Sequence, residues 1–267
     1  MAVITLISDM GTSDYYVAAI KGTILSSNPN AIIVDITHEV PPFNISYAGF
    51  TLKHCFKDFP LGTVHIIGVL PESDEQTNHI AVSYEGHFFI GADNGLFSLI
   101  FDREPDHIVV LNNMNQTHSQ SFPTKTIFAQ AATFLSLGKP IEELGVSTMD
   151  YRRTFGLLPT ATEDLLKGSV IHIDRYGNLI SNITRQEFDN QQKGRPFRIV
   201  FGKSGYNITQ ISKQYNDVGE AKAVAIFSEN GLLEIAINKG AKGHGGGASQ
   251  LFGMKTYDVI RIEFDDR

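Results

Sequence analysis

The sequence has little cysteine, no tryptophan and no long apolar run. Its one cysteine, Cys55, excludes an internal disulfide framework and any metal site built from several thiolates. No apolar stretch approaches the roughly 20 residues that span a bilayer. The amino terminus has neither a basic segment nor a small-residue cleavage site, so a secretory signal is not expected. We therefore expect a soluble, cytoplasmic protein with no membrane partner.

Positive charge is also scarce. The chain has 22 Lys and Arg residues against 29 Asp and Glu residues, and its net charge is −7. Proteins that bind nucleic acid through its phosphates usually present a basic face, so we expect no nucleic-acid partner. The histidines are scattered, and His38-Glu39 is not followed by a second histidine at helical spacing. The sequence therefore predicts no metal site.

Apolar runs and helical patterns alternate in the first half of the chain. The order is strand, helix, strand, helix, strand, over residues 2–8, 16–25, 31–36, 45–57 and 63–70. Such alternation predicts a mostly parallel sheet with helices on its faces. Residues 79–101 then read as strand, turn and strand. We expect an α/β domain over 1–155.

The second half has a different pattern. Residues 156–164 are rich in Thr, Glu and Asp and are interpreted as a linker. After it, short apolar runs are separated by Gly and Asn turns, which is typical of β structure. We expect an all-β barrel domain over 165–267.

One candidate binding residue, Asp9, follows the first strand. Ligands of open α/β sheets bind beyond the carboxyl ends of the strands. A carboxylate there can accept both hydrogen bonds of a ribose diol, and Gly11 would let the backbone approach closely. The alternative is an aspartate that only starts a helix. The dinucleotide fingerprint G-x-G-x-x-G is absent.

Two further candidates lie in the β half. Asp174, Tyr176 and Asn178 combine an aromatic face with an amide, which suits a purine. Ser228, Glu229, Asn230 and Glu234 form a polar cluster that could hold the ammonium and carboxylate of an amino acid. The alternative for both is an ordinary hairpin turn.

Taken together, these segments resemble one superfamily. The resemblance runs through ITLISDMGTSDYYVAAIKG, IVDITHEVPPFNI, FPLGTVHIIGV, FFIGADNGLFSL, IHIDRYGNLISNI and NGLLEIAIN. The chain is similar to the S-adenosylmethionine (SAM) hydroxide adenosyltransferases and to the related SAM-dependent fluorinases and chlorinases. The order and spacing of these segments agree over nearly the whole chain.

The resemblance implies a fold, an assembly and a reaction. Members are trimers of an α/β domain and a β barrel, and SAM binds between the N domain of one subunit and the C domain of its neighbour. A nucleophile displaces methionine from the ribose C5′, without metal or redox cofactor. Asp9 would bind the ribose hydroxyls, and Asp174, Tyr176 and Asn178 the adenine and methionine side. The methionine end would be bound by Ser228, Glu229, Asn230 and Glu234.

The chain departs from the family pattern at the attacking water. Hydroxide-transferring members carry an Asp, an Arg and a His there. Leu70 stands at the Asp position, no Arg follows closely, and Phe122-Pro123-Thr124-Lys125 replaces the segment with the His. Halogenases have a Tyr at the position of Leu70. Ser73 and Thr124 match their hydroxyl positions.

Several interpretations follow from this departure. We expect a SAM hydrolase that yields adenosine and methionine, with Ser73, Thr124 and Glu72 positioning water and with Leu70 and Phe122 lining the substrate site. Asp74 or His79 could also orient or deprotonate the water. The alternatives are a SAM- or adenosine-binding protein without catalysis, a halogenase-like enzyme, or use of another nucleophile or adenosyl compound.

Overall fold

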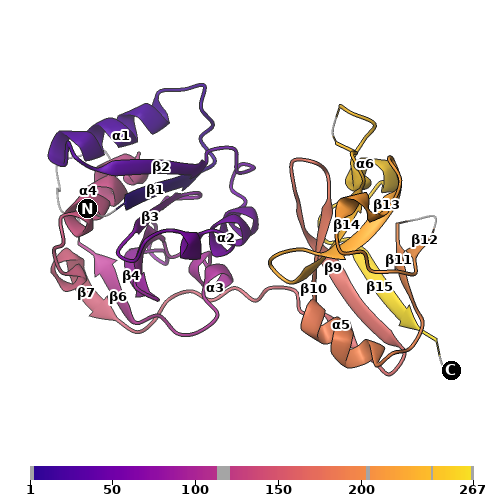
Figure 1. Ribbon diagram of the computed structural model, residues 1–267. Helices are drawn as coiled ribbons and strands as arrows, with labels where there is room; N and C mark the ends of the chain where they lie inside the picture. The colour runs from indigo at the N-terminus through magenta and orange to yellow at the C-terminus, as the bar shows by residue number, and fades with distance from the viewer. Residues whose placement is uncertain (1–2, 113–120, 203–204, 242, 266–267) are drawn as a thin grey trace. The chain divides into compact units, whose positions relative to one another are not determined.

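The computed structural model describes residues 3–112, 121–202, 205–241 and 243–265 (Figure 1). Its chain divides into two units, Met1–Phe155 and Gly156–Arg267. Within the described ranges, no helix is both long and apolar enough to cross a membrane. The same ranges contain no group of three or more His, Cys, Asp or Glu side chains placed to hold a metal ion.

The first unit is a seven-stranded sheet in the order β2-β1-β3-β5-β4-β6-β7. Its strands are β1 (Val3–Ser8), β2 (Ile32–Thr37), β3 (Val64–Gly68), β4 (His79–Tyr84), β5 (His87–Ala92), β6 (His107–Leu111) and β7 (Gly145–Thr148). Neighbours are parallel from β2 through β1 and β3 to β5, and antiparallel from β5 through β4 and β6 to β7. The sheet is mixed but mostly parallel, because only β4 and β7 run opposite to the other strands. Its β4–β5 hairpin is the strand–turn–strand that the sequence indicates.

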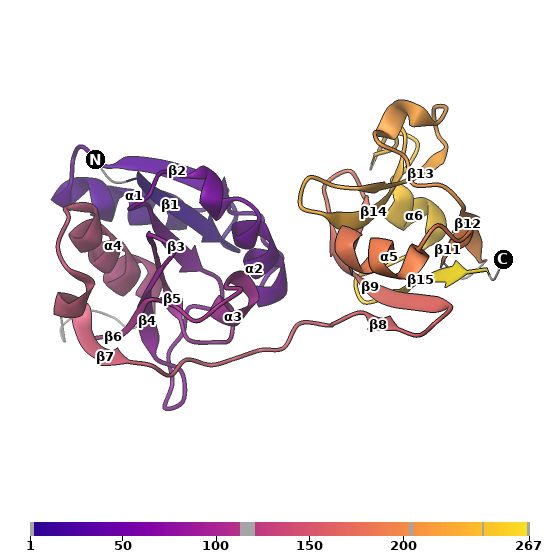
Figure 2. The same cartoon turned by 60° about the horizontal axis from the view of Figure 1, so that its bottom comes forward.

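Helices cover both faces of this sheet (Figures 1 and 2). They are α1 (Tyr16–Ser27), α2 (Ile45–Lys53), α3 (Phe97–Ile100) and α4 (Ala129–Ser136), with short turns η1 (Phe56–Asp58), η2 (Thr124–Phe128) and η3 (Ile141–Leu144). In β1, Ile4 and Leu6 face the core under α1 and α4, whereas Ile7 faces the core under α2 and α3. Burial on both faces explains why apolar residues in this strand do not alternate regularly with polar ones.

The second unit is an antiparallel, barrel-like sheet in the order β12-β11-β15-β9-β10-β14-β13, with β8 beside β9. Its strands are β8 (Thr160–Ala161), β9 (Leu165–Ile173), β10 (Leu179–Thr184), β11 (Phe197–Phe201), β12 (Tyr206–Ile208), β13 (Ala223–Phe227), β14 (Leu232–Ile237) and β15 (Val259–Phe264). Just after β12, Ser212 bridges to Ile226 of β13. The two edges therefore nearly close the sheet. Because β8 pairs with β9, part of the predicted linker 156–164 is attached to this unit.

The expectation of an all-β second domain missed its helices. The structure adds α5 (Arg185–Gln192), α6 (Ala248–Phe252) and the short turn η4 (Tyr215–Asp217). Helix α5 begins with a reciprocal cap, in which the Thr184 side chain accepts from the Glu187 N–H and the Glu187 carboxylate accepts from the Thr184 N–H. The Thr-x-x-Glu spacing of that cap is legible in the sequence.

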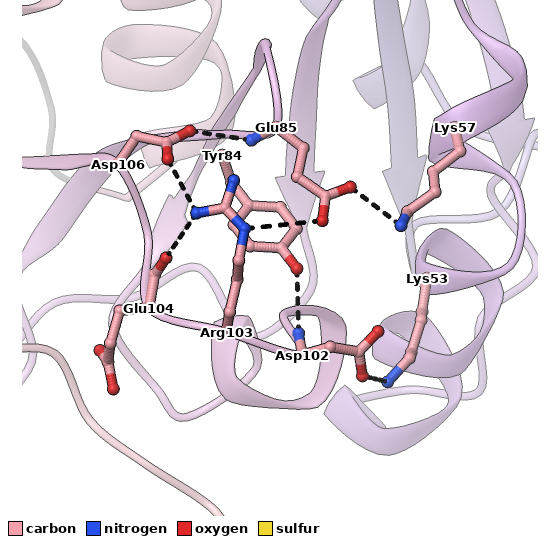
Figure 3. A network of polar contacts seen from close by, with 8 residues as sticks. All are labelled: Lys53, Lys57, Tyr84, Glu85, Asp102, Arg103, Glu104 and Asp106. Atoms are coloured by element: carbon pink, nitrogen blue, oxygen red, sulfur yellow. Dashed lines mark hydrogen bonds and ion pairs between the residues drawn. The ribbon is translucent and has the colours of Figure 1, made fainter.

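A group of charged side chains surrounds the β4–β5 turn (Figure 3). It consists of Lys53, Lys57, Tyr84, Glu85, Asp102, Arg103, Glu104 and Asp106. Asp106 accepts from the Glu85 N–H at 3.0 Å and from Arg103 at 2.9 Å, and the Arg103 guanidinium lies over the Tyr84 ring. This turn precedes β5, so the group lies at the opposite sheet edge from the carboxyl ends of β1 and β3. We assign it to stabilising the turn.

Candidate functional site

Asp9 lies directly after β1, at the carboxyl edge of the parallel strands. Its carboxylate accepts a hydrogen bond from the Phe43 N–H at 2.8 Å. Helix α1 starts seven residues later, and its N-cap residue Tyr15 makes no side-chain capping bond. The alternative in which Asp9 only starts a helix is therefore wrong. The carboxylate is half-buried and remains available to a ligand.

Phe43 is a candidate site residue that the sequence reasoning missed. Its side chain is 68% exposed, and its backbone has a φ of 64°, which non-glycine residues seldom adopt. An exposed aromatic ring in a strained backbone, next to a carboxylate, is typical of a ligand site rather than of a packed loop. Neither feature is visible in the sequence, because both depend on how residues 38–43 meet Asp9.

Leu70, which follows β3, also has an unusual backbone conformation. Its φ is 46°, and its side chain is 37% exposed. The Asn94 amide donates to the Leu70 carbonyl at 3.0 Å and also reaches the Val69 carbonyl at 3.3 Å. A leucine in this conformation costs about 1 kcal/mol or more, which these bonds offset. The Asn94 amide therefore fixes the backbone of Leu70.

Thr124 is the buried hydroxyl of the site. It is the first residue of η2, it is 1% exposed, and its Oγ1 has no hydrogen-bond partner among the described residues. It packs on Gly68, the last residue of β3: a Cβ there would lie 2.9 Å from the Thr124 Cγ2 and 3.4 Å from the Met10 Cε. A buried polar atom without a partner is unusual, and this makes Thr124 a candidate for binding a small polar ligand.

The segment after β3 holds the other water-positioning candidates. Glu72 and Ser73 are exposed. His79 is buried, and its Nε2 lies 2.8 Å from the Pro71 carbonyl oxygen. Burial lowers the pKa of His79, although the Pro71 carbonyl and the Glu72 charge act against this. The imidazole is therefore neutral at pH 7.

Arginine and aromatic side chains reach this edge from distant parts of the sequence. Arg152 donates to the Gln76 carbonyl at 3.2 Å, and its backbone N–H donates to Asp93 at 2.8 Å. The sequence has no arginine shortly after Leu70, but the fold supplies Arg152 to the same loop. Phe122 packs edge-on against Tyr16, with ring centroids 5.4 Å apart.

The second unit brings Asp174, Asn178 and Glu234 together. Asp174 accepts from the Asn178 backbone N–H at 2.9 Å and from its side-chain amide at 3.0 Å. Glu234 is 4% exposed and accepts from the Tyr215 hydroxyl at 2.8 Å. Tyr176, in the same turn as Asn178, is 62% exposed.

The buried carboxylate of this group has a perturbed acidity. Burial raises the pKa of Glu234, and the Asp174 charge raises it further, although the Tyr215 hydrogen bond acts against both. Burial also raises the pKa of Tyr215, and Glu234 adds to this. A cation beside the buried Glu234 and the half-buried Asp174 would offset the repulsion between the two carboxylates.

Ser228, Glu229 and Asn230 lie elsewhere in this unit. They form the β13–β14 turn, next to the end of β10 at Thr184, whereas Asp174 and Asn178 lie before the start of β10. Asn230 lines a shallow hollow of about 560 Å³ at the start of α5. The structure therefore places these predicted residues at the opposite end of the β10–β14 pair from Asp174, with no direct contact between the two groups.

Models of known protein families match both units of the chain. A family model described as the SAM hydroxide adenosyltransferase N-terminal domain matches residues 4–145, and one described as its C-terminal domain matches residues 168–261. The chain belongs to the SAM hydroxide adenosyltransferase family. Within this family, Asp9, Leu70 and Thr124 fall in the N-terminal domain, and Asp174, Asn178 and Glu234 in the C-terminal domain.

Named relatives and solved structures match most of the chain. A protein of Thermus thermophilus named (R)-S-adenosyl-L-methionine hydrolase is 28% identical over 98% of this chain and 100% of its own. One of the same name from Methanocaldococcus jannaschii is 32% identical over 88% of each chain. A fluorinase of an Actinoplanes species is 24% identical over 70% of this chain and 73% of its own. An uncharacterised Thermotoga maritima protein superposes with a TM-score of 0.87, at 28% identity over 97% of this chain and 99% of its own.

Proposed function

We propose that this protein hydrolyses SAM to adenosine and L-methionine. A water oxygen bonds to the ribose C5′, the C5′–S bond breaks, and the sulfonium takes the electron pair to become a neutral thioether. The water proton leaves to solvent. The observation that supports this most is the match, over nearly the whole chain, to relatives named (R)-S-adenosyl-L-methionine hydrolase.

The chemistry requires little from the protein. The sulfonium is already a good leaving group, so neither a general acid nor a cofactor is needed. The site has to hold water in line with the C5′–S bond and away from bulk solvent. Thr124 suits this task because its buried Oγ1 can bond to that water. In this proposal Ser73 and Glu72 help to orient the water, and Leu70 and Phe122 pack on the sugar.

The two units supply complementary parts of the substrate site. Asp9 accepts from the ribose hydroxyls, with Phe43 beside the nucleoside. The Asp174 and Glu234 carboxylates attract the methionine ammonium, and Tyr176 offers an exposed ring to the adenine. As in the family resemblance, we propose that the two units come from neighbouring copies of a homotrimer in the cytoplasm, without nucleic-acid partners.

A halide-transferring activity is the second candidate. Ser73 and Thr124 stand where the halogenases have hydroxyl residues, and several relatives are named fluorinase. Leu70 occurs in place of the halogenase Tyr, and this difference favours water as the nucleophile.

Product analysis tests the proposal. The purified protein is incubated with each sulfonium epimer of SAM, with and without chloride, and the nucleosides are separated by chromatography. We expect adenosine in both media, at a rate that chloride does not change. Chlorodeoxyadenosine would support the halogenase instead. Intact SAM together with a measurable heat of binding would show a binding protein without catalysis and would contradict the proposal.

A further inference from the structure

The turn that carries Asp9 is attached to the segment after β2 at four points. The Gly11 N–H donates to the His38 carbonyl at 2.8 Å, and the Val40 N–H donates to the Ser8 carbonyl at 3.3 Å. The Phe43 N–H donates to the Asp9 carboxylate at 2.8 Å. The fourth contact joins side chains: the Ser8 Oγ and the His38 Nδ1 are 2.7 Å apart. Residues 38–43 therefore act as the support of this turn.

His38 is the central member of a chain of polar side chains. It is 4% exposed, and its Nε2 lies 3.2 Å from the Asp35 Oδ1. The other Asp35 oxygen accepts from the Lys21 ammonium at 2.6 Å. The chain runs from the surface pair Lys21–Asp35 through the buried imidazole to Ser8, the residue before Asp9.

The charges along this chain set the hydrogen positions. Burial alone would raise the pKa of Asp35, but its hydrogen bonds with Lys21 and His38 lower it overall, so it is a carboxylate at neutral pH. The His38 Nε2 is within ion-pair distance of the Asp35 carboxylate but makes no hydrogen bond among the described residues, and a carboxylate on that side favours the tautomer with the proton on Nε2. Nδ1 is then the acceptor, and Ser8 donates to it. Asp35 thereby favours the arrangement in which the Ser8 hydroxyl donates to the ring at 2.7 Å.

We propose that His38 is a positioning residue for Asp9, an inference that rests on the proposed binding of a nucleoside by Asp9. Held by Asp35, the imidazole fixes Ser8 and the turn behind it, so that the Asp9 carboxylate meets the ribose hydroxyls without rearrangement. The Ser8-His38-Asp35 arrangement resembles that of a serine hydrolase, but the proposed displacement at C5′ uses water as the nucleophile, and the buried Ser8 hydroxyl lies against His38. Its role is support, not attack.

A ligand–variant cycle tests this coupling. The affinities of adenosine and 2′,3′-dideoxyadenosine are measured by calorimetry for the wild type, Asp9→Asn and His38→Gln. Removing the hydroxyls should cost the wild type about 10-fold or more. For His38→Gln we expect adenosine to bind about 10-fold more weakly than it binds the wild type. The ratio between the affinities of adenosine and 2′,3′-dideoxyadenosine should shrink by a similar factor. A general structural defect would instead weaken both ligands equally.

A surface variant keeps the test independent of any folding defect. Asp35→Asn removes the charge beside His38, at a side chain that is 40% exposed. We expect this variant to weaken adenosine binding less than His38→Gln does, and again to affect adenosine more than 2′,3′-dideoxyadenosine. Asp102→Asn is the control, because Asp102 also pairs with a lysine but lies at the opposite sheet edge (Figure 3).

The outcomes separate the inference from the assignment on which it rests. Equal losses for the two ligands in His38→Gln and in Asp35→Asn, with a clear hydroxyl effect in Asp9→Asn, would overturn the role of His38 alone. If Asp9→Asn shows no hydroxyl effect either, the proposed nucleoside site is wrong and the inference is overturned with it.

Discussion

Replacing Asp9 with alanine should weaken adenosine binding by about 10- to 100-fold, because hydrogen bonds to a charged group each contribute about 1.5–3 kcal/mol. The carboxylate accepts from the Phe43 N–H, so its loss also releases the loop that carries the exposed Phe43 ring. Calorimetry with adenosine measures the effect directly.

The control for this change is Asp102→Ala, which removes a carboxylate from the far edge of the same sheet. It should leave adenosine affinity unchanged. If Asp9→Ala binds adenosine as tightly as the wild type, the carboxyl edge of β1 is not the ribose site.

Replacing Glu234 with glutamine should separate the two ends of the substrate. We expect SAM affinity to fall by about 10- to 100-fold, because a charge-assisted bond to the ammonium becomes a neutral one. Adenosine, which lacks the amino-acid end, should bind as before. The glutamine oxygen can still accept from Tyr215, so the fold should survive.

The same residue predicts a pH dependence. Only ionised Glu234 attracts the ammonium, and burial raises the pKa of its carboxyl group. As the pH is lowered from neutrality, SAM binding should therefore begin to weaken at a higher pH than it would with a glutamate of ordinary pKa. Glu234→Gln should remove this weakening. Glu263→Gln, a half-buried carboxylate paired with Arg198 in the same unit, is the control. Equal changes for SAM and adenosine would contradict the assignment.

Much of the fold is legible in the sequence because its signals are local. β1 is an apolar run because both of its faces are buried, and the rule that ligands bind beyond strand ends leads directly to Asp9. The sequence contains a signal for helix α5, the capping pair Thr184 and Glu187. The expectation of an all-β domain missed this helix because the surrounding segments have a β pattern. The candidate residues Asp174 and Asn178 were found because they share one short turn.

The missed features depend on long-range contacts. The left-handed backbone of Leu70 is held by Asn94, 24 residues later, and nothing in the sequence around a leucine indicates such a conformation. The Phe43 backbone is positioned by its hydrogen bond to Asp9, 34 residues earlier. Tyr215 meets Glu234 only because the sheet of the second unit nearly closes. Arg152 reaches the loop after β3 from the end of the first unit, which no local spacing reveals.

The most direct test of the account is the fate of the oxygen atom in the product. SAM is incubated with the protein in water enriched in oxygen-18, and the adenosine is analysed by mass spectrometry with fragmentation of the ribose. Attack of water at C5′ predicts one heavy oxygen in each adenosine, located in the 5′-hydroxyl group. Adenosine without the label, or with the label elsewhere, would contradict displacement by water at that carbon.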